Sequence, residues 1–460
     1  MLSSRLPKDL SPSPFFAELE RVKADVKARA SAGGLSFIDM TVSSPVKAGL
    51  PIDMDMAVED ARKDFGCWNP DAAGWKSTRE AVAEYYRERG GNFDAGQIIL
   101  TASTSEAYSV LFKAFCDPGD VILTPMPGYP LLDTLAQLEH LECAPYFLKL
   151  KREKKKDVIL EGHGPDRIQK KSISPIASTM LQGDKKDCFR FVLDTDSLLA
   201  APEKAKILLL VSPHNPTGHC VSRTEWNEVV AFCEQHNLIL VVDEVFGDYG
   251  FSDDVRRTWE YVPGLCHSKS LSSACHSGPW SNNVAIGDRI QDDTSGPKCP
   301  IFWLNGLSKA VGSPQLKLGW MAFYAPEEQF EPIRAALEFV EDAYLSVSAP
   351  AQALGTSLLK QSDAYESRVK ERLLQNWNTL RQAFPSKYCP EVLGGWYAAI
   401  RLGEDDEQLT LGLLREKHVL VQPGFFFDFD EDGWVVVSLL QEPALFKEAV
   451  KRILYITRGN

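Results

Sequence analysis

Between two apolar runs the chain carries the segment Leu304-Asn-Gly-Leu-Ser308-Lys309-Ala-Val-Gly-Ser-Pro-Gln-Leu-Lys317-Leu-Gly-Trp320-Met. The runs, Ile301 to Leu304 and Leu318 to Tyr324, have the length and composition of buried strands. The turn between them therefore holds Lys309 on a short, restrained loop. The pKa of a lysine falls when its side chain is desolvated, and a neutral amine attacks carbonyl groups to form a Schiff base. Taken alone, the segment leaves two interpretations open, a solvated loop lysine and a carbonyl-reactive amine.

Composition places the chain among soluble globular proteins. It has 460 residues, of which 44% are hydrophobic and 25% charged, enough for two or three domains or one large α/β enzyme. The formal net charge of −13 argues against a protein that binds nucleic-acid backbones. The one basic run, residues 151–156, is short and is expected to be a solvated loop.

No targeting or membrane-spanning segment is evident. Residues 1–14 lack the apolar core of a secretory signal, and no apolar run is long enough to cross a bilayer. The ten cysteines include no C-x-x-C pair, which favours reduced thiols over a disulfide framework or a zinc site. We therefore expect a cytoplasmic protein that has no metal site and takes neither nucleic acid nor a membrane as a partner.

Short apolar runs alternate with helical patterns along much of the chain. Ser103 and Glu106 have the spacing of a capping box, and a helical stripe follows them. This alternation is typical of an α/β fold with a mostly parallel, doubly wound sheet that helices cover on both faces. The runs expected as strands are residues 98–101, 121–124, 207–211, 238–242, 301–304 and 318–324.

Changes in sequence texture suggest where the domains divide. Two polar stretches, near residues 151–196 and 252–300, are expected as surface insertions, and the second is a candidate lid over the site. Beyond them the pattern changes to long helices followed by short strands. The expected units are an N-terminal segment that packs with the small domain (1–55), a large domain (56–325) and a small α+β domain (326–460).

Polar side chains follow the expected strands at the ends where ligands bind in parallel sheets. The N–H groups of a helix N-terminus suit an anion, while an aromatic ring, an amide, a strand-end carboxylate and a lysine suit a cationic aromatic aldehyde. Each feature alone could be a turn, a helix cap or a surface residue, but together they describe a pocket for pyridoxal phosphate. The residues are Ser103 with Thr104, Tyr129, Asn215, Asp243 and Lys309.

In these residues the chain resembles the class I and II aminotransferases, the fold-type I pyridoxal phosphate enzymes. The resemblance covers roughly residues 35–455 outside the two insertions. Its most specific motifs are Asn215-Pro-Thr-Gly218, Asp243-Glu-Val, and Ser308-Lys309 with the Gly-Trp320 that follows. The resemblance implies pyridoxal phosphate as the cofactor and a homodimer whose subunits share the active site.

It also implies a role for each residue. Lys309 is expected to form the Schiff base with the cofactor and later to move the substrate proton. Asp243 is expected to pair with the pyridinium nitrogen, which keeps the ring an electron sink. Asn215 is expected to hydrogen-bond the phenolate oxygen, and Tyr129 to stack on the ring. The expected phosphate ligands are Ser103, Thr104, Ser308 and Lys317.

Several family positions are altered in this chain. The usual phosphate-binding arginine is Lys317, a point charge with less directional grip. A common serine before the lysine is Gly306, and the tyrosine that helps to hold the phenolate oxygen is Phe246, so Asn215 must do more of that work. Where a tyrosine from the neighbouring subunit often reaches the phosphate, this chain has Trp68.

The last departure concerns the substrate. When residues 434–440 are aligned with the family's C-terminal strand, the arginine that clamps the substrate α-carboxylate falls at Val436. Valine cannot bind a carboxylate. Arg401 is a candidate substitute, and its plainer interpretation is a solvent-facing arginine that closes a strand.

The leading interpretation is an aminotransferase that moves an amino group between an amino acid or amine and a 2-oxo acid through Lys309. Because the same scaffold performs other reactions, an elimination lyase, which needs no amino acceptor, is the alternative. A third interpretation, a non-catalytic regulator, is motivated by Val436. It is opposed by the presence of Lys309, Asp243 and Asn215 together.

Overall fold

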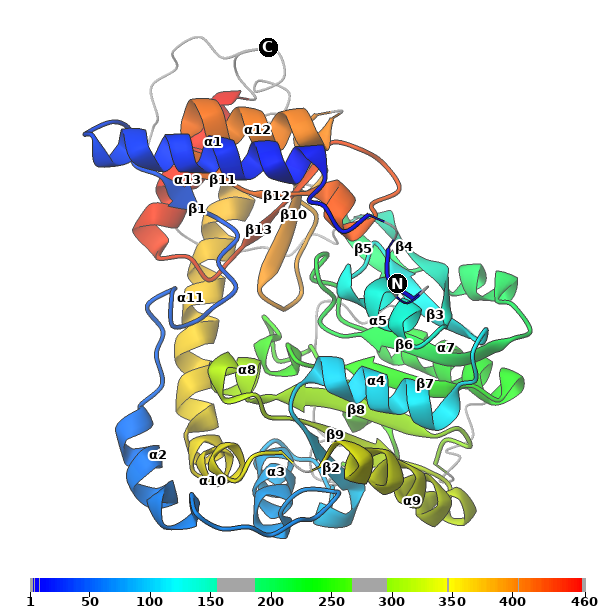
Figure 1. Ribbon diagram of the computed structural model, residues 1–460. Helices are drawn as coiled ribbons and strands as arrows, with labels where there is room; N and C mark the ends of the chain where they lie inside the picture. The colour runs from blue at the N-terminus through cyan, green and yellow to red at the C-terminus, as the bar shows by residue number, and fades with distance from the viewer. Residues whose placement is uncertain are drawn as a thin grey trace.

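The computed structural model describes residues 3, 5–7, 9–154, 187–266, 296–345, 347–403 and 405–456, and within these ranges the central sheet has eight strands. Strand β9 runs antiparallel to both of its neighbours, β5 runs antiparallel to β4, and the remaining strands are parallel (Figure 1). In spatial order the strands are β2 (Ile98–Thr101), β9 (Gly319–Tyr324), β8 (Ile301–Gly306), β7 (Ile239–Asp243), β6 (Ala205–Val211), β3 (Val121–Met126), β4 (Glu142–Lys154) and β5 (Asp187–Leu193).

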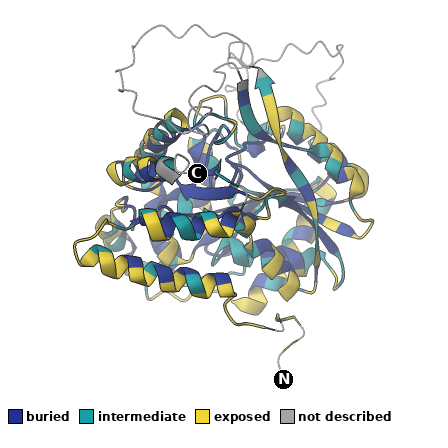
Figure 2. Cartoon of the chain, turned by 90° about the horizontal axis from the view of Figure 1, so that it is seen from above, coloured by how far each residue is buried: buried dark blue, intermediate teal, exposed yellow. Residues whose placement is uncertain are grey.

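Helices cover both faces of this sheet, as the alternating pattern predicts. Successive strand residues point to opposite faces, so Ile207 and Leu209 enter one core cluster while Leu208 and Leu210 enter the other. The buried residues, dark blue in Figure 2, lie between the exposed outer faces of the helices. The helices of the first face are α4 (Thr104–Phe115), α5 (Leu131–Leu138) and α9 (Glu327–Tyr344), and those of the second include α3 (Lys76–Glu88) and α7 (Arg223–His236).

The start of α4 follows from its capping residues. The Ser103 hydroxyl oxygen accepts a hydrogen bond from the N–H of Glu106 at 3.1 Å, as the sequence predicts. The Glu106 carboxylate accepts from the N–H of Ala102 rather than from Ser103. The hydrogen bonds therefore fix the turn between β2 and α4, and the free N–H groups of the first turn lie at the carboxyl edge of the sheet.

The small domain is built on a three-stranded antiparallel sheet and the long helix α11 (Ser362–Ala383). The N-terminal part of the chain joins it, because β1 (Ile38–Asp39) pairs in parallel with β11 (Val419–Leu420) and α1 (Pro14–Ser31) packs on α12 (Asp406–Lys417). The sheet strands are β10 (Tyr397–Arg401), β13 (Trp434–Ser438) and β12 (Gln422–Pro423), and the chain ends in α13 (Pro443–Ile456).

Short elements complete the chain. The α-helical ones are α2 (Met54–Ala61), α8 (Leu307–Ala310) and α10 (Ala349–Leu358). The 3₁₀ turns are η1 (Arg62–Asp64), η2 (Ala95–Gln97), η3 (Thr195–Ala200), η4 (Gly247–Tyr249), η5 (Thr258–Tyr261), η6 (Pro314–Leu316), η7 (Leu359–Gln361) and η8 (Gly424–Phe427).

The two polar stretches are described only in part. Residues 155–186 and 267–295, and with them most of both expected insertions and of the candidate lid, lie outside the described residues. The described flanks of the first stretch form paired ends of β4 and β5, with Cys188 and Phe191 buried. None of the helices in the described ranges has the length and apolar character needed to cross a membrane.

Candidate active site

The carboxyl ends of β6, β7 and β8 lie side by side, because the three strands are parallel neighbours. Val211 at the end of β6 pairs with Asp243, and Asp243 pairs with Leu304 of β8. In Figure 1 the short helix α8, which follows β8, lies at this edge and faces α11 of the small domain. The topology therefore places Asp243 and Lys309 at the same edge, facing the small domain.

Asp243 is a strand-end carboxylate held by two donors. One oxygen accepts from the Tyr108 hydroxyl at 2.8 Å, and the other accepts from the N–H of Val245 at 3.1 Å. Burial raises the pKa of Asp243, and the Val245 N–H, the Tyr108 hydroxyl and the Lys309 ammonium oppose that rise. The group is thus a poorly hydrated carboxylate that a further cation would stabilise.

Lys309 is held in α8 with its amine in a largely apolar setting. Its Nζ atom lies 4.6 Å from the ring centroid of Trp396 and 5.6 Å from that of Phe246. The Tyr249 hydroxyl donates to the Lys309 carbonyl oxygen at 2.6 Å. Burial lowers the pKa of Lys309 to about 8, and the Asp243 carboxylate opposes the fall. The amine therefore loses its proton far more readily than an ordinary lysine, although most of it is still charged at pH 7, and this suits a nucleophile and a base.

The expected anion site at the start of α4 lies in close backbone contact with β9. A Cβ added to Gly319 would lie only 3.0 Å from the Ser103 carbonyl carbon and 3.1 Å from the Thr104 nitrogen. Only glycine lets β9 approach this peptide so closely. Ser308 is half-buried in α8, and Lys317, two residues before Gly319, is exposed with φ of 53°. The structure thus brings Ser103 and Thr104 together with the segment that carries Lys317.

Asn215 and Tyr129 lie at the same edge of the sheet. The side-chain oxygen of Asn215 is buried and has no hydrogen-bond partner among the described groups, so its amide is available to a ligand. Burial and the Asp243 carboxylate raise the pKa of Tyr129, although 44% of the tyrosine remains exposed. The N–H of Gly128 donates to the Phe427 carbonyl of the small domain at 2.8 Å, and this bond closes the site on that side.

The small domain presents aromatic and aliphatic side chains to this edge. Directly opposed residues of an antiparallel pair point to the same face, so Val436, opposite Ala399, shares its face with Tyr397. Val436 is completely buried. Arg401 forms an ion pair with Glu431 and lies about 16 Å further along the chain than Trp396, at about 3.3 Å per residue. The structure does not bring Arg401 to Lys309.

Three residues of the site were missed by sequence reasoning. Tyr108 could have been found from the helical stripe of α4, because it comes five residues after Ser103 and faces the sheet. Tyr249 lies six residues after Asp243, in a turn that the pattern does not define. Trp396 stands directly before β10 in the predicted small domain, and nothing local indicates that its ring contacts Lys309.

Solved structures share this fold. An alanine aminotransferase from Pyrococcus furiosus has a TM-score of 0.70 at 19% identity, over 98% of this chain and 100% of that one. An aspartate aminotransferase from Thermotoga maritima has a TM-score of 0.69 at 19% identity, over 99% of each chain. The protein therefore has the fold of the aminotransferases.

Sequence comparison then identifies the family. Residues 64–164 and 177–453 match the family described as aminotransferase class I and II. The alanine aminotransferase of Mycobacterium tuberculosis is 24% identical over 87% of this chain and 81% of its own length. The tyrosine aminotransferase of Mus musculus is 24% identical over 97% of this chain and 86% of its own length. The chain belongs to the class I and II aminotransferases and is a transferase of amino groups, which confirms the predicted family and general activity.

The family implies pyridoxal phosphate, and the residues present fit that group. The amide N–H groups of Asn215 can donate to a ring oxygen, the half-buried carboxylate of Asp243 suits a ring cation, and the glycine-lined start of α4 suits a phosphate. When bound, the cofactor supplies an electron sink for the carbon from which the substrate proton leaves.

Proposed function

We propose that this aminotransferase holds pyridoxal phosphate through Lys309 and moves an amino group from an amino acid or amine to a 2-oxo acid. One observation supports this above the others: the amine of Lys309, with its pKa lowered to about 8, lies at the same sheet edge as the half-buried carboxylate of Asp243. A neutral amine is needed both to bond to a carbonyl carbon and to take up a proton.

The remaining polar groups bind and orient the cofactor. Asp243 holds a proton on the ring nitrogen by its charge, and Tyr108 and the Val245 N–H hold Asp243 in place. Asn215 binds the ring oxygen alone, because Phe246 is a buried ring without a hydroxyl. Tyr129 covers the ring face. The phosphate ligands are the N–H groups of Ser103 and Thr104 with the side chains of Ser308 and Lys317.

The donor side of the site has an apolar character. Val436 and Tyr397 share the face of the small-domain sheet on which a clamping arginine would stand, and Arg401 is engaged with Glu431. Among the described residues near Lys309, no guanidinium is therefore placed for a substrate carboxylate. We propose that donors without an α-carboxylate are accepted alongside amino acids.

We further propose a cytoplasmic homodimer whose interface includes the exposed loop around Trp68. Trp68 and Phe339 are 77% and 79% exposed, which is unusual for such large apolar side chains. A molar mass measured by light scattering at twice 51.2 kDa would support the dimer. The mass of a single chain would contradict the dimer, and a dimer mass that persists in Trp68→Ser would contradict a role for this loop.

The reaction is tested by product analysis. The purified protein is incubated with pyridoxal phosphate, a panel of amino acids and simple amines, and 2-oxo acids of different side chains. Formation of the amino acid that corresponds to the added 2-oxo acid is the expected result. Release of ammonia without use of the 2-oxo acid would instead identify an elimination. Loss of all turnover in Lys309→Ala, with folding retained, is also expected.

A further inference from the structure

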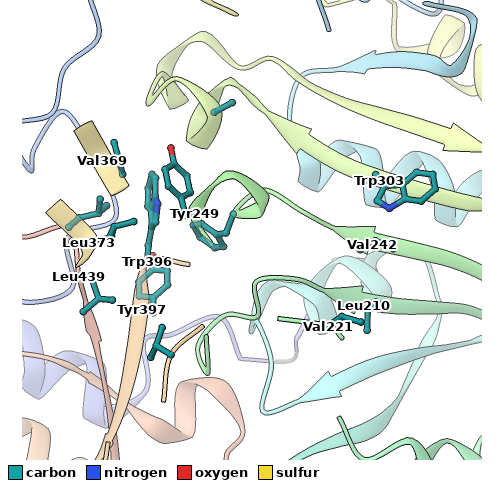
Figure 3. Close-up of a cluster of buried hydrophobic side chains, with 14 of the residues drawn as sticks. Leu210, Val221, Val242, Tyr249, Trp303, Val369, Leu373, Trp396, Tyr397 and Leu439 are labelled. Carbon is teal, nitrogen blue, oxygen red and sulfur yellow. The ribbon is translucent and has the colours of Figure 1, made fainter. Parts of the chain in front are cut away.

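Trp396 is a small-domain residue buried next to the reactive lysine of the large domain. It stands directly before β10, its exposure is zero, and its indole N–H has no hydrogen-bond partner among the described groups. Figure 3 shows its ring between Val369 and Leu373 of α11 on one side and Tyr249 on the other. Packing, rather than hydrogen bonding of the N–H, therefore fixes the orientation of the ring.

The face of this ring is close to the Lys309 amine. Nζ lies 4.6 Å from the centroid, and a cation within about 6 Å of a tryptophan face is attracted by the ring quadrupole. Phe246 contributes a second face at 5.6 Å. The charged group that acts on Lys309 from the large domain is Asp243. The ammonium form of Lys309 is thus stabilised by one carboxylate and two rings in a dehydrated setting.

The indole is in turn held by neighbouring rings and by its own main chain. Its centroid is 5.3 Å from that of Phe246 and 5.2 Å from that of Tyr249. The Trp396 carbonyl accepts from the N–H of Leu439 at 2.8 Å, which joins it to the residue after β13. A movement of the small-domain sheet would therefore move the ring.

Two glycines carry Trp396 into the large domain. The N–H of Gly395 donates to the Tyr249 carbonyl at 2.9 Å, and the N–H of Gly394 donates to the Gly218 carbonyl at 3.2 Å. A Cβ at Gly394 would lie 2.8 Å from the Tyr249 carbonyl oxygen, and Gly395 has φ of +89°. Neither position accepts a larger residue without displacement or strain. The turn is shaped so that Trp396 reaches Lys309.

We propose that Trp396 is a positioning residue whose indole face binds the ammonium form of Lys309 and thereby couples the reactive amine to the position of the small domain. The proposal rests on the proposed function of Lys309 as the amine that bonds to the cofactor. It adds that a residue outside the large domain determines the position of this amine and the proton affinity of Nζ.

The first test measures the pKa of Lys309 in the full-length protein without cofactor, by competitive acetylation across pH and mass spectrometry of the Lys309 peptide. The protein is prepared with ordinary tryptophan or with fluorinated tryptophan, which keeps the ring shape and weakens its quadrupole. The expected result is a pKa lowered by fluorination, with a loss of proton affinity of about threefold or more. The same fluorination in Trp396→Phe should leave the pKa of Lys309 unchanged.

A second test compares three variants to separate this role from general packing. Trp396→Leu should lower the pKa of Lys309 by up to about one unit, a tenfold loss of proton affinity. Trp434→Leu removes another buried small-domain tryptophan, one that stacks on Phe429, and should have no effect. Trp396→Phe, which keeps an aromatic face, should lower the pKa of Lys309 less than Trp396→Leu does.

Three results would overturn the proposal. These are an unchanged Lys309 pKa on fluorination, an equal change in the Trp396→Phe background, and a raised pKa in Trp396→Leu, which would mean that the indole only excludes water. Because Lys309 is titrated without cofactor, the measurement is independent of whether pyridoxal phosphate bonds to this residue. Failure of the proposal and failure of the proposed function are therefore distinguishable.

Discussion

Replacement of Lys309 by methionine should stabilise the cofactor-free protein. The pKa of Lys309 is lowered to about 8 from an ordinary value of 10.5 because burial penalises the ammonium form. At about 1.4 kcal/mol per pH unit, the wild-type protein loses roughly 3 kcal/mol of folding free energy at pH 7 by keeping this group charged. Methionine has similar length and no charge. Because the lowered pKa already includes the attraction of the Asp243 carboxylate, we expect a gain of up to about 3 kcal/mol in the free energy of unfolding.

The stability difference between Lys309→Met and the wild type should depend on pH in a defined direction. Between pH 8 and 10.5 the unfolded chain holds a proton on Lys309 that the folded chain has released, so wild-type stability rises through this range relative to Lys309→Met. The advantage of the variant is therefore complete below pH 8 and absent above 10.5. The assay is urea unfolding of cofactor-free protein at several pH values, with Lys317→Met as the control because Lys317 is exposed. Lower stability of Lys309→Met than of wild type at pH 7, or a gain that persists at pH 10.5, would refute the reasoning.

Two further predictions concern cofactor binding. Tyr108→Phe removes a 2.8 Å hydrogen bond to Asp243, so the pKa of that carboxyl should rise further, and on acidification the affinity for pyridoxal phosphate should begin to fall at a higher pH than in the wild type. Tyr146→Phe, which loses a buried hydrogen bond to a carbonyl, should leave that pH unchanged. Gly319→Ala places a methyl group about 3 Å from the Ser103–Thr104 peptide and should weaken cofactor binding by ~1–3 kcal/mol, measured by spectroscopic titration. Unchanged affinity would mean that this peptide does not bind the phosphate.

Most of the elements could be predicted from sequence because their signals are local. The apolar run of residues 98–101 coincides with β2, and the helical stripe predicted after Ser103 and Glu106 becomes α4. The Ser103–Glu106 spacing predicts the start of α4 for a physical reason, since a hydroxyl must satisfy a free N–H. The alternation of apolar runs and helical stripes was enough to predict the doubly wound sheet.

The rest of the site depends on contacts between distant parts of the chain. Tyr108 and Asp243 are 135 residues apart, and Trp396 meets Lys309 only because two glycines pass between Tyr249 and Pro213. No local pattern encodes such a contact. The same holds for Arg401, whose strand position was predicted but whose partner, Glu431, depends on the fold of the loop before β13.

The central claim is that Lys309 is the residue bonded to the cofactor. The most direct test incubates the protein with pyridoxal phosphate, reduces it with borohydride, and maps the added mass by peptide mass spectrometry. We predict the added mass on the peptide that contains Lys309, and its absence in Lys309→Ala. Added mass on another lysine such as Lys317, or unchanged labelling in Lys309→Ala, would contradict the account.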